Sequence, residues 1–176
     1  MRYYLVGFMG SGKSYLGKLW AALHHLSFYD LDTLIEQKEN SSIANIFEQK
    51  GEQYFRALES KILKKTETLE NAIISCGGGT ACFNNNMQWM KNNGTTIFLH
   101  ASIENLLKNI VQEKQKRPLL ANITEDNLEK FIQNKLDERL HYYAASNIIL
   151  QQTDLNENGF IKVLQYNKDE IGRAHV

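Results

Sequence analysis

The stretch GFMGSGKS, residues Gly7–Ser14, fits the pattern G-x-x-x-x-G-K-[ST] and directly follows the apolar run Tyr3–Val6. A strand, a glycine-rich loop and a helix in this order are the context in which the pattern binds nucleotide phosphate. Glycines let backbone N–H groups turn toward the β-phosphate, Lys13 reaches the β and γ oxygens, and the Ser14 hydroxyl binds Mg²⁺. The positive N-terminal end of the following helix points at the same anion. The sequence therefore predicts a phosphate-binding loop, since a merely flexible turn would leave Lys13 and Ser14 unexplained.

The composition favours one domain over residues 1–176 with small-molecule partners. The chain has 176 residues, with 20 basic and 20 acidic side chains and no polybasic block, so we expect no binding to nucleic acid or to an anionic membrane surface. No apolar run reaches membrane-spanning length, and Gly12–Ser14 interrupts the N-terminal apolar stretch before a signal-peptide core forms. Cys76 and Cys82 lack metal-binding or CxxC spacing, which indicates reduced thiols. We expect a cytoplasmic monomer.

Apolar runs rich in strand-forming residues alternate with longer stretches of helical periodicity. The expected strands are Tyr3–Val6, Leu26–Tyr29, Ala72–Ser75, Thr95–Leu99 and Asn147–Leu150. The expected helices are Lys13–His24, Leu31–Lys38, Ile43–Gln49, Glu52–Leu69, Asn84–Asn92, Ile103–Glu113, Glu125–Ala145 and Gly159–Asn167. This alternation predicts an α/β domain with a parallel sheet, in which ligands bind beyond the carboxyl ends of the strands.

Three local features refine this pattern. Ser41 and Ser42 suit the N-cap of the helix from Ile43, and Gly51 suits a stop between two helices. The irregular, charged segment Gln112–Thr124 contains the only proline of the chain. We expect that segment to be a flap that moves over the site.

Two acids, Asp30 and Asp32, follow the second expected strand. In an extended backbone, alternate side chains project to the same side, here toward the phosphate loop. Phosphoryl transfer needs one carboxylate near Mg²⁺ and another that positions, or accepts a proton from, the attacking oxygen. Alternatively, one of the two acids caps the helix that begins near Leu31. Both interpretations can hold together, but capping alone does not require two acids.

Glycines and arginines supply the remaining candidate residues. Cys76-Gly77-Gly78-Gly79 ends the third expected strand, where glycines expose backbone donors to a ligand or simply form a turn. Cys76 itself is expected to be a small buried residue, because no base is positioned beside it. Arg56 and Glu59 are helix neighbours, and the pair either orients the guanidinium or is an ordinary solvated ion pair.

Two further arginines lie in distinctive positions: Arg117 beside Pro118, and Arg139 with Tyr143 in the long helix that follows. Guanidinium groups suit bidentate binding of carboxylate or phosphate, a geometry that lysine cannot reproduce. The five histidines form no metal-binding pattern.

Taken in order, these motifs resemble those of the shikimate kinases. The matching segments are GFMGSGKS at Gly7–Ser14, DLD at Asp30–Asp32, IFEQKGEQYFRALE at Ile46–Glu59, CGGG at Cys76–Gly79, RPLL at Arg117–Leu120 and RLHYY at Arg139–Tyr143. The resemblance covers nearly the whole chain and implies a three-layer P-loop kinase fold like that of the nucleoside monophosphate kinases, with a central five-stranded parallel sheet flanked by helices. It also implies a shikimate-binding region at about residues 31–60 and a lid at about residues 112–124, and we expect a disordered tail over residues 168–176.

The activity implied by the resemblance is ATP-dependent phosphorylation of the shikimate 3-hydroxyl, in the chorismate route to aromatic amino acids. The nucleotide side would comprise Lys13 with the Gly10, Ser11 and Gly12 backbone at the ATP phosphates, Tyr15 next to them, Ser14 as the Mg²⁺ ligand, and Asp30 as a metal-side acid acting largely through water. The substrate side would comprise Asp32 on the shikimate hydroxyls, Arg56 and Arg139 on the carboxylate, Glu59 steadying Arg56, and backbone donors at Gly78 and Gly79. Arg117 would close over the transferred phosphoryl group, which makes Lys13, Asp32 and Arg117 the catalytic residues. The family commonly has an arginine near the adenine, where this chain has Lys108-Asn109, so the resemblance does not extend to adenine stacking.

Three other functions remain open at this point. A gluconate or nucleoside monophosphate kinase would use the same loop but not the paired arginines. A regulatory GTPase is suggested by Asn134-Lys135-Leu136-Asp137, which fits N-K-x-D, but this stretch falls inside an expected helix. A catalytically silent relative would bind the same ligands without turnover.

Overall fold

The computed structural model describes residues 1–113 and 125–173, and a five-stranded sheet forms its centre. The strands are β1 (Arg2–Val6), β2 (Ser27–Asp30), β3 (Ala72–Ser75), β4 (Thr95–His100) and β5 (Ile148–Gln151). They lie in the order β2-β3-β1-β4-β5, and every neighbouring pair is parallel. The predicted α/β fold with a five-stranded parallel sheet is therefore confirmed.

Helices separate the strands along the chain, as the periodicity predicted. They are α1 (Lys13–Leu23), α2 (Leu31–Glu39), α3 (Ile43–Lys65), α4 (Asn86–Asn93), α5 (Ile103–Glu113), α6 (Glu125–Ala144) and α7 (Phe160–Arg173). Short 3₁₀ turns at Thr66–Thr68, Thr80–Cys82 and Gln152–Asp154 complete the described structure.

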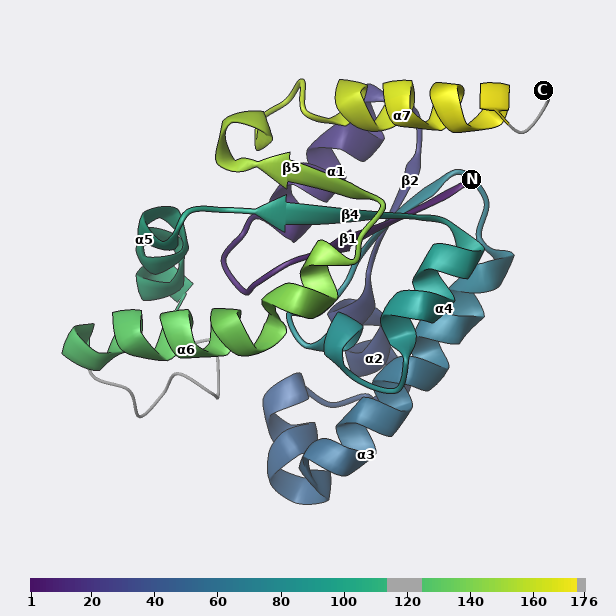
Figure 1. The fold of residues 1–176 in the computed structure, drawn as a ribbon. Helices are drawn as coiled ribbons and strands as arrows, with labels where there is room; N and C mark the ends of the chain where they lie inside the picture. The colour runs from purple at the N-terminus through teal and green to yellow at the C-terminus, as the bar shows by residue number, and fades with distance from the viewer. Residues whose placement is uncertain (114–124, 174–176) are drawn as a thin grey trace.

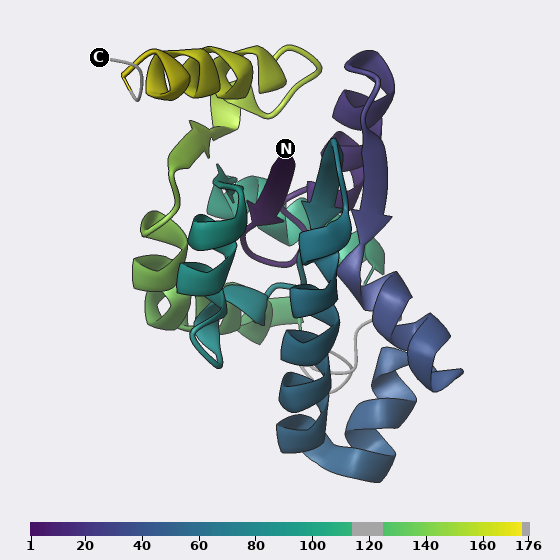
Figure 2. The same cartoon turned by 90° about the vertical axis from the view of Figure 1, so that its right-hand side faces the viewer.

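Alternate residues of the buried strands enter two separate apolar cores. On β1, Tyr4 and Val6 belong to the core that α3, α4 and α6 share, whereas Tyr3 and Leu5 belong to the core beneath α1 and α7. The sheet is thus the middle of three layers, with α1 and α7 on one face (Figures 1 and 2). Because all five strands are parallel, their carboxyl ends share one edge of the sheet, and the residues that follow them gather there.

Helix α3 is bent at Gly51, where the sequence predicted a stop between two helices. Gly51 has φ of 80° and ψ of 169°, so the helical backbone is interrupted at this residue. The helix begins after Ser42, whose hydroxyl accepts a hydrogen bond from the Asn45 N–H at 3.2 Å, as expected for an N-cap. Helix α2 and the first half of α3 lie below the sheet in both views (Figures 1 and 2).

The C-terminal tail contains more helix than the sequence indicated, whereas helix α5 has the predicted bounds. Helix α7 ends at Arg173, whereas the sequence predicted an end at Asn167, so residues 168–173 are helical and not a disordered tail. The burial of Phe160 and Val163 at its start anchors this helix to the sheet. Helix α5 includes Gln112 and Glu113, the first residues of the expected lid, and residues 114–124 lie outside the described part of the chain. No helix among the described residues is long and apolar enough to cross a membrane.

Candidate active site

The segment Gly7–Ser14 forms the loop between β1 and α1. Gly10 and Gly12 have φ of 79° and 87°, a left-handed conformation in which a side chain would be strained. The Ser11 N–H donates to the Phe8 carbonyl at 3.2 Å, which closes a tight turn. A loop of this shape that opens a helix can bind an anion through its backbone N–H groups.

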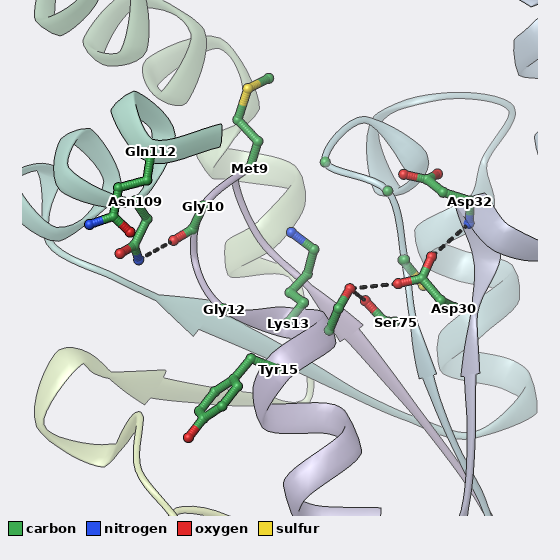
Figure 3. A pocket seen from close by; sticks show the side chains of 14 residues that line it. Met9, Gly10, Gly12, Lys13, Tyr15, Asp30, Asp32, Ser75, Asn109 and Gln112 are labelled. Atoms are coloured by element: carbon green, nitrogen blue, oxygen red, sulfur yellow. Dashed lines mark hydrogen bonds between the residues drawn. The ribbon is translucent and has the colours of Figure 1, made fainter. Parts of the chain in front are cut away.

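Lys13 directs its ammonium group to the inside of this loop. Its Nζ donates to the carbonyls of Gly7 at 2.7 Å and Phe8 at 2.8 Å, and the residue is only 8% exposed. The side chain lines the adjoining cavity between Gly10 and Asp30 (Figure 3). A positive charge is therefore held where phosphate oxygens would enter.

Two cavities adjoin at the carboxyl edge of the sheet. The first, of about 380 Å³, is lined by Met9, Gly10, Gly12, Lys13, Ser14, Tyr15, Asp30, Asp32, Ser75, Cys76, Gly77, Gly78, Asn109 and Gln112. The second, of about 290 Å³, is lined by Met9, Asp32, Glu36, Ser42, Ile43, Ala44, Phe47, Phe55, Arg56, Glu59, Gly77, Gly78, Gly79 and Arg139. We name them the loop cavity and the arginine cavity. Both contain Asp32 and Gly78, so the two cavities meet at these residues.

Ser14 and Asp30 form a pair of oxygen donors on the wall of the loop cavity. The Ser14 hydroxyl donates to Asp30 Oδ2 at 2.5 Å and lies 3.1 Å from the Ser75 hydroxyl (Figure 3). Asp30 Oδ1 accepts hydrogen bonds from the backbone N–H groups of Asp32 at 3.1 Å and Thr33 at 3.3 Å. Asp30 therefore caps α2 with one oxygen and faces Ser14 with the other, so the capping role and the site role are compatible.

Asp32 lies in the first turn of α2, and not in the extended backbone that the sequence argument assumed. The Asp30 cap starts the helix at Leu31, so the alternation rule does not apply to this residue. Both acids nevertheless line the loop cavity. A Cβ atom at position 77 would lie 3.0 Å from Asp32 Oδ1, so glycine at this position leaves room for the Asp32 carboxylate.

Arg56 is held by two carboxylates within α3. Its Nη1 donates to Glu59 Oε2 at 2.9 Å, and its Nε and Nη2 both donate to Glu52 Oε1 at 3.3 Å. Arg56 is 8% exposed and Glu59 is fully buried, so the alternative of a solvated ion pair is wrong. The Glu59 Oε1 atom accepts a further hydrogen bond from Thr80 at 2.6 Å. Loss of either partner in such a buried pair leaves an uncompensated charge.

Aromatic rings surround the same guanidinium group. The Arg56 Cζ atom lies 4.3 Å from the ring centre of Phe83, 5.1 Å from that of Phe55 and 5.9 Å from that of Phe47. Such contacts favour a cation over the ring face and restrict its orientation. Phe47 and Phe55 also line the arginine cavity, which gives that cavity apolar walls beside its charged groups.

The glycines that follow β3 bring the two arginines together. A Cβ atom at Gly79 would lie 2.6 Å from Arg56 Nη2, and one at Gly78 would lie 3.6 Å from Arg139 Nη1. Tyr143, one helical turn beyond Arg139 on α6, donates its hydroxyl to the Gly78 carbonyl. Burial raises the pKa of Tyr143, which keeps the phenol neutral and therefore a donor. The arginine cavity thus has two cationic groups and a turn of glycine backbone.

Both cysteines are poorly suited to nucleophilic chemistry. Cys76 is buried, and this burial raises the pKa of its thiol. Burial also raises the pKa of the Cys82 thiol, to about 11. Both thiols therefore stay protonated near neutral pH, in agreement with the structural role expected for Cys76.

The sequence did not identify several residues that line the two cavities. Met9, Gly77, Asn109, Gln112 and Phe47 are examples. Met9 and Gly77 belong to motifs that the sequence analysis recognised. Their place within those motifs could have identified them as residues of the site. Asn109 and Phe47 fall in segments that the family resemblance singled out, but their own contacts depend on packing between distant segments.

Two other candidates from the sequence are Arg117 and the N-K-x-D pattern at Asn134–Asp137. Arg117 lies outside the described residues. Asn134–Asp137 lies within α6, where Asp137 accepts a hydrogen bond from Gln133 at 2.8 Å, and none of these residues lines either cavity. The N-K-x-D pattern therefore lies within a helix away from the cavities, which removes the basis for a GTPase.

Comparison with known proteins gives one consistent family. The sequence model of the shikimate kinase family matches residues 9–168. A shikimate kinase of Parabacteroides distasonis is 37% identical over 171 residues, which cover 93% of this chain and 99% of that protein. The crystal structure of a shikimate kinase from Bacteroides thetaiotaomicron superposes with a TM-score of 0.87 at 34% identity, over 96% of this chain and 98% of that one. A shikimate kinase from Acinetobacter baumannii in complex with shikimate superposes with a TM-score of 0.85 at 28% identity, over 95% and 94% of the two chains.

Proposed function

The chain belongs to the shikimate kinase family, and we propose that its two adjoining cavities bind the two substrates of that family's reaction. The enzyme phosphorylates the 3-hydroxyl of shikimate with ATP, which yields shikimate 3-phosphate and ADP for chorismate and aromatic amino acid biosynthesis. The observation that carries the assignment of the cavities is the position of Asp32. This acid lines both cavities, with Lys13 in one and the paired arginines in the other.

In this proposal, ATP binds in the loop cavity. The backbone of Gly10, Ser11 and Gly12 surrounds the β-phosphate, and Lys13 exchanges its loop carbonyls for phosphate oxygens. This exchange is favourable because ionic hydrogen bonds are stronger than those to neutral carbonyls. Tyr15 is 72% exposed at the rim of the cavity, where it can contact the nucleotide.

Ser14 and Asp30 are the proposed contacts for Mg²⁺. Their oxygens are the hard ligands that this ion prefers, and Mg²⁺ commonly combines one or two protein ligands with phosphates and water. Across residues 1–113 and 125–173, no group of three or more His, Cys, Asp or Glu could hold a metal ion, which suits such a sparse protein site. The bound ion would offset negative charge on the phosphate oxygens.

Shikimate binds in the arginine cavity, with its carboxylate on Arg56 and Arg139. Glu52 and Glu59 occupy one N–H on each nitrogen of the Arg56 guanidinium, which leaves one further N–H on each terminal nitrogen. Guanidinium N–H groups are suited to binding a carboxylate. Glu52 and Glu59 would therefore orient the arginine without using the part that the substrate needs.

The ring hydroxyls of shikimate would contact the turn after β3 and Asp32. The Gly78 and Gly79 N–H groups have no hydrogen-bond acceptor within the described part of the chain, and the Gly78 carbonyl is fixed by Tyr143. These N–H groups can therefore donate to a hydroxyl. Asp32 would orient the attacking hydroxyl toward the loop cavity and accept its proton. Binding at the carboxylate end thus fixes the reacting oxygen in line with the phosphate.

The remaining expectations rest on the family resemblance. Arg117 would close over the transferred phosphoryl group from the lid, and this closure would exclude water as a competing acceptor. We also propose that the chain acts as a single domain, as a monomer and in the cytoplasm.

A coupled assay for ADP release tests the proposed function. We expect ADP to form with ATP only when shikimate is added, because water alone is a poorly positioned acceptor. Phosphorus NMR should identify shikimate 3-phosphate as the product, and GTP in place of ATP should support little turnover. Phosphorylation of gluconate or of a nucleoside monophosphate, with shikimate unchanged, would reject the proposal. The same panel distinguishes a catalytically silent relative, which would release no ADP with any acceptor.

A further inference from the structure

We propose that Asn109 is a positioning residue for the phosphate loop and thereby sets the affinity for the nucleotide. The inference rests on the proposed binding of ATP in the loop cavity. Asn109 Nδ2 donates to the Gly10 carbonyl at 2.8 Å across a sequence separation of 99 residues (Figure 3). Through this bond, a side chain of helix α5 contacts the backbone of the phosphate loop directly.

The contact is supported by packing on both sides of Asn109. A Cβ atom at Gly10 would lie 2.9 Å from Ile110 Cγ1 and 3.3 Å from the Leu106 carbonyl. Helix α5 therefore rests directly on Gly10, and the amide of Asn109 is held at its acceptor by buried neighbours. Glycine is required at position 10 both by this close approach and by its φ of 79°.

The geometry of one peptide group explains how this bond acts on the ligand. The Gly10 carbonyl and the Ser11 N–H belong to the same planar peptide and point in opposite directions. Asn109 holds the carbonyl on the α5 side. The Ser11 N–H then points into the loop, toward the Phe8 carbonyl that also accepts the Lys13 ammonium. The bond outside the loop thus fixes the direction of a donor inside it, at the place where a phosphate would bind.

The residue type matters because the loop presents an acceptor. Asparagine supplies an uncharged donor that matches the Gly10 carbonyl. An aspartate of nearly the same shape would place a second acceptor and a negative charge against that carbonyl, and close to the bound phosphates. Asn109→Ala removes the hydrogen-bond donor, whereas Asn109→Asp replaces it with a charged acceptor. Comparing the two variants therefore distinguishes loss of the bond from repulsion between two acceptors.

Isothermal titration with ADP measures this effect without turnover. For Asn109→Ala we expect the Kd for ADP and the KM for ATP to rise roughly three- to tenfold, the range that one hydrogen bond accounts for. For Asn109→Asp we expect a rise of more than about tenfold, because the substituted group repels its former partner. The Kd for shikimate should stay within about twofold of the wild-type value in both variants, since Asn109 does not line the arginine cavity.

Asn105→Ala is the matched control. Asn105 lies one turn earlier on α5. Within residues 1–113 and 125–173 its amide bonds to the Ser102 hydroxyl and not to the loop, so its loss perturbs the same helix without removing a loop contact. We expect this variant to bind ADP like the wild type. Titrations run well below the unfolding midpoint of each variant ensure that only folded protein is compared.

Two results would overturn the inference: ADP affinity unchanged in both Asn109 variants, or equal losses for ADP and shikimate, which would indicate a general structural role. The proposed function is tested separately, by the turnover of the wild-type protein with shikimate. The role of Asn109 is tested by the ratio of the Kd for ADP between variant and wild type.

Discussion

At the scale of single residues, substitution of Asp32 should have a large effect on activity. It is the acid shared by the two cavities, and its carboxylate is held against Gly77 in the first turn of α2. We expect Asp32→Asn to lower kcat by roughly 10²- to 10⁴-fold, because an amide can neither accept the proton nor orient the hydroxyl as a carboxylate does. The Kd for ADP should change little, and steady-state kinetics together with titration would measure both quantities.

Asp137→Asn provides the control for this change. Asp137 is an exposed acid on α6 that bonds to Gln133 and lines neither cavity. The same change of charge there should leave kcat unaltered. Unimpaired turnover in the Asp32 variant would remove that residue from the mechanism.

The residues that could be predicted were those whose chemistry is local in sequence. Lys13 and Ser14 follow from the loop pattern, and Arg56 with Glu59 from helical spacing. The hydrogen bond of Asn109 could not be predicted, because it depends on how α5 packs on a loop 99 residues away. Helical spacing alone did not show whether Arg56 and Glu59 were solvated, since burial depends on the folded neighbours and not on the spacing.

At the scale of elements, the bend in α3 depends on Gly51. Its φ of 80° and ψ of 169° lie in a region that essentially only glycine occupies. A Cβ atom at this position would meet nothing within 4 Å, so the cost of a substitution is purely conformational. We expect Gly51→Ala to lower the free energy of unfolding by about 1–3 kcal/mol, which urea denaturation would measure.

Gln53→Ala is the comparison for that prediction. Gln53 is exposed on the second half of α3, where the backbone is helical, so alanine there should change the free energy of unfolding by less than about 0.5 kcal/mol. If Gly51→Ala were as well tolerated as Gln53→Ala, the bend would not need the glycine conformation.

The elements themselves were largely predictable, because apolar periodicity marks strands and helices that pack on one sheet. The break at Gly51 was also predictable, since glycine is the residue that ends helices. The backbone of Asp32 was wrongly expected to be extended. The helix predicted from Leu31 does begin there, after the Asp30 cap, so the extended geometry assumed for Asp32 conflicted with that predicted helix. The continuation of α7 to Arg173 was missed because the polar residues after Asn167 mask the helical period.

At the scale of the whole molecule, composition and alternation predicted the class of fold but not the order of the strands. The sequence of β3 does not indicate that this strand lies between β2 and β1. That order is set by which faces pack best, which the sequence does not reveal. The order matters for function, because it places the ends of β1, β2 and β3 side by side, and with them Lys13, Asp30 and the Gly77–Gly79 turn.

Because the two cavities adjoin without coinciding, nucleotide and shikimate should stabilise the molecule together. Each ligand at about 100 times its Kd should add about 2.7 kcal/mol to the free energy of unfolding, and both together about 5 kcal/mol, as measured by urea denaturation with ADP and shikimate. Ligands that competed for one cavity would instead give about 3 kcal/mol in the mixture. Gly79→Ala makes the test specific, because its Cβ atom would lie 2.6 Å from Arg56 Nη2 and displace the guanidinium. That variant should lose the increment from shikimate and keep the increment from ADP, whereas loss of both would mean that the two cavities do not bind their ligands separately.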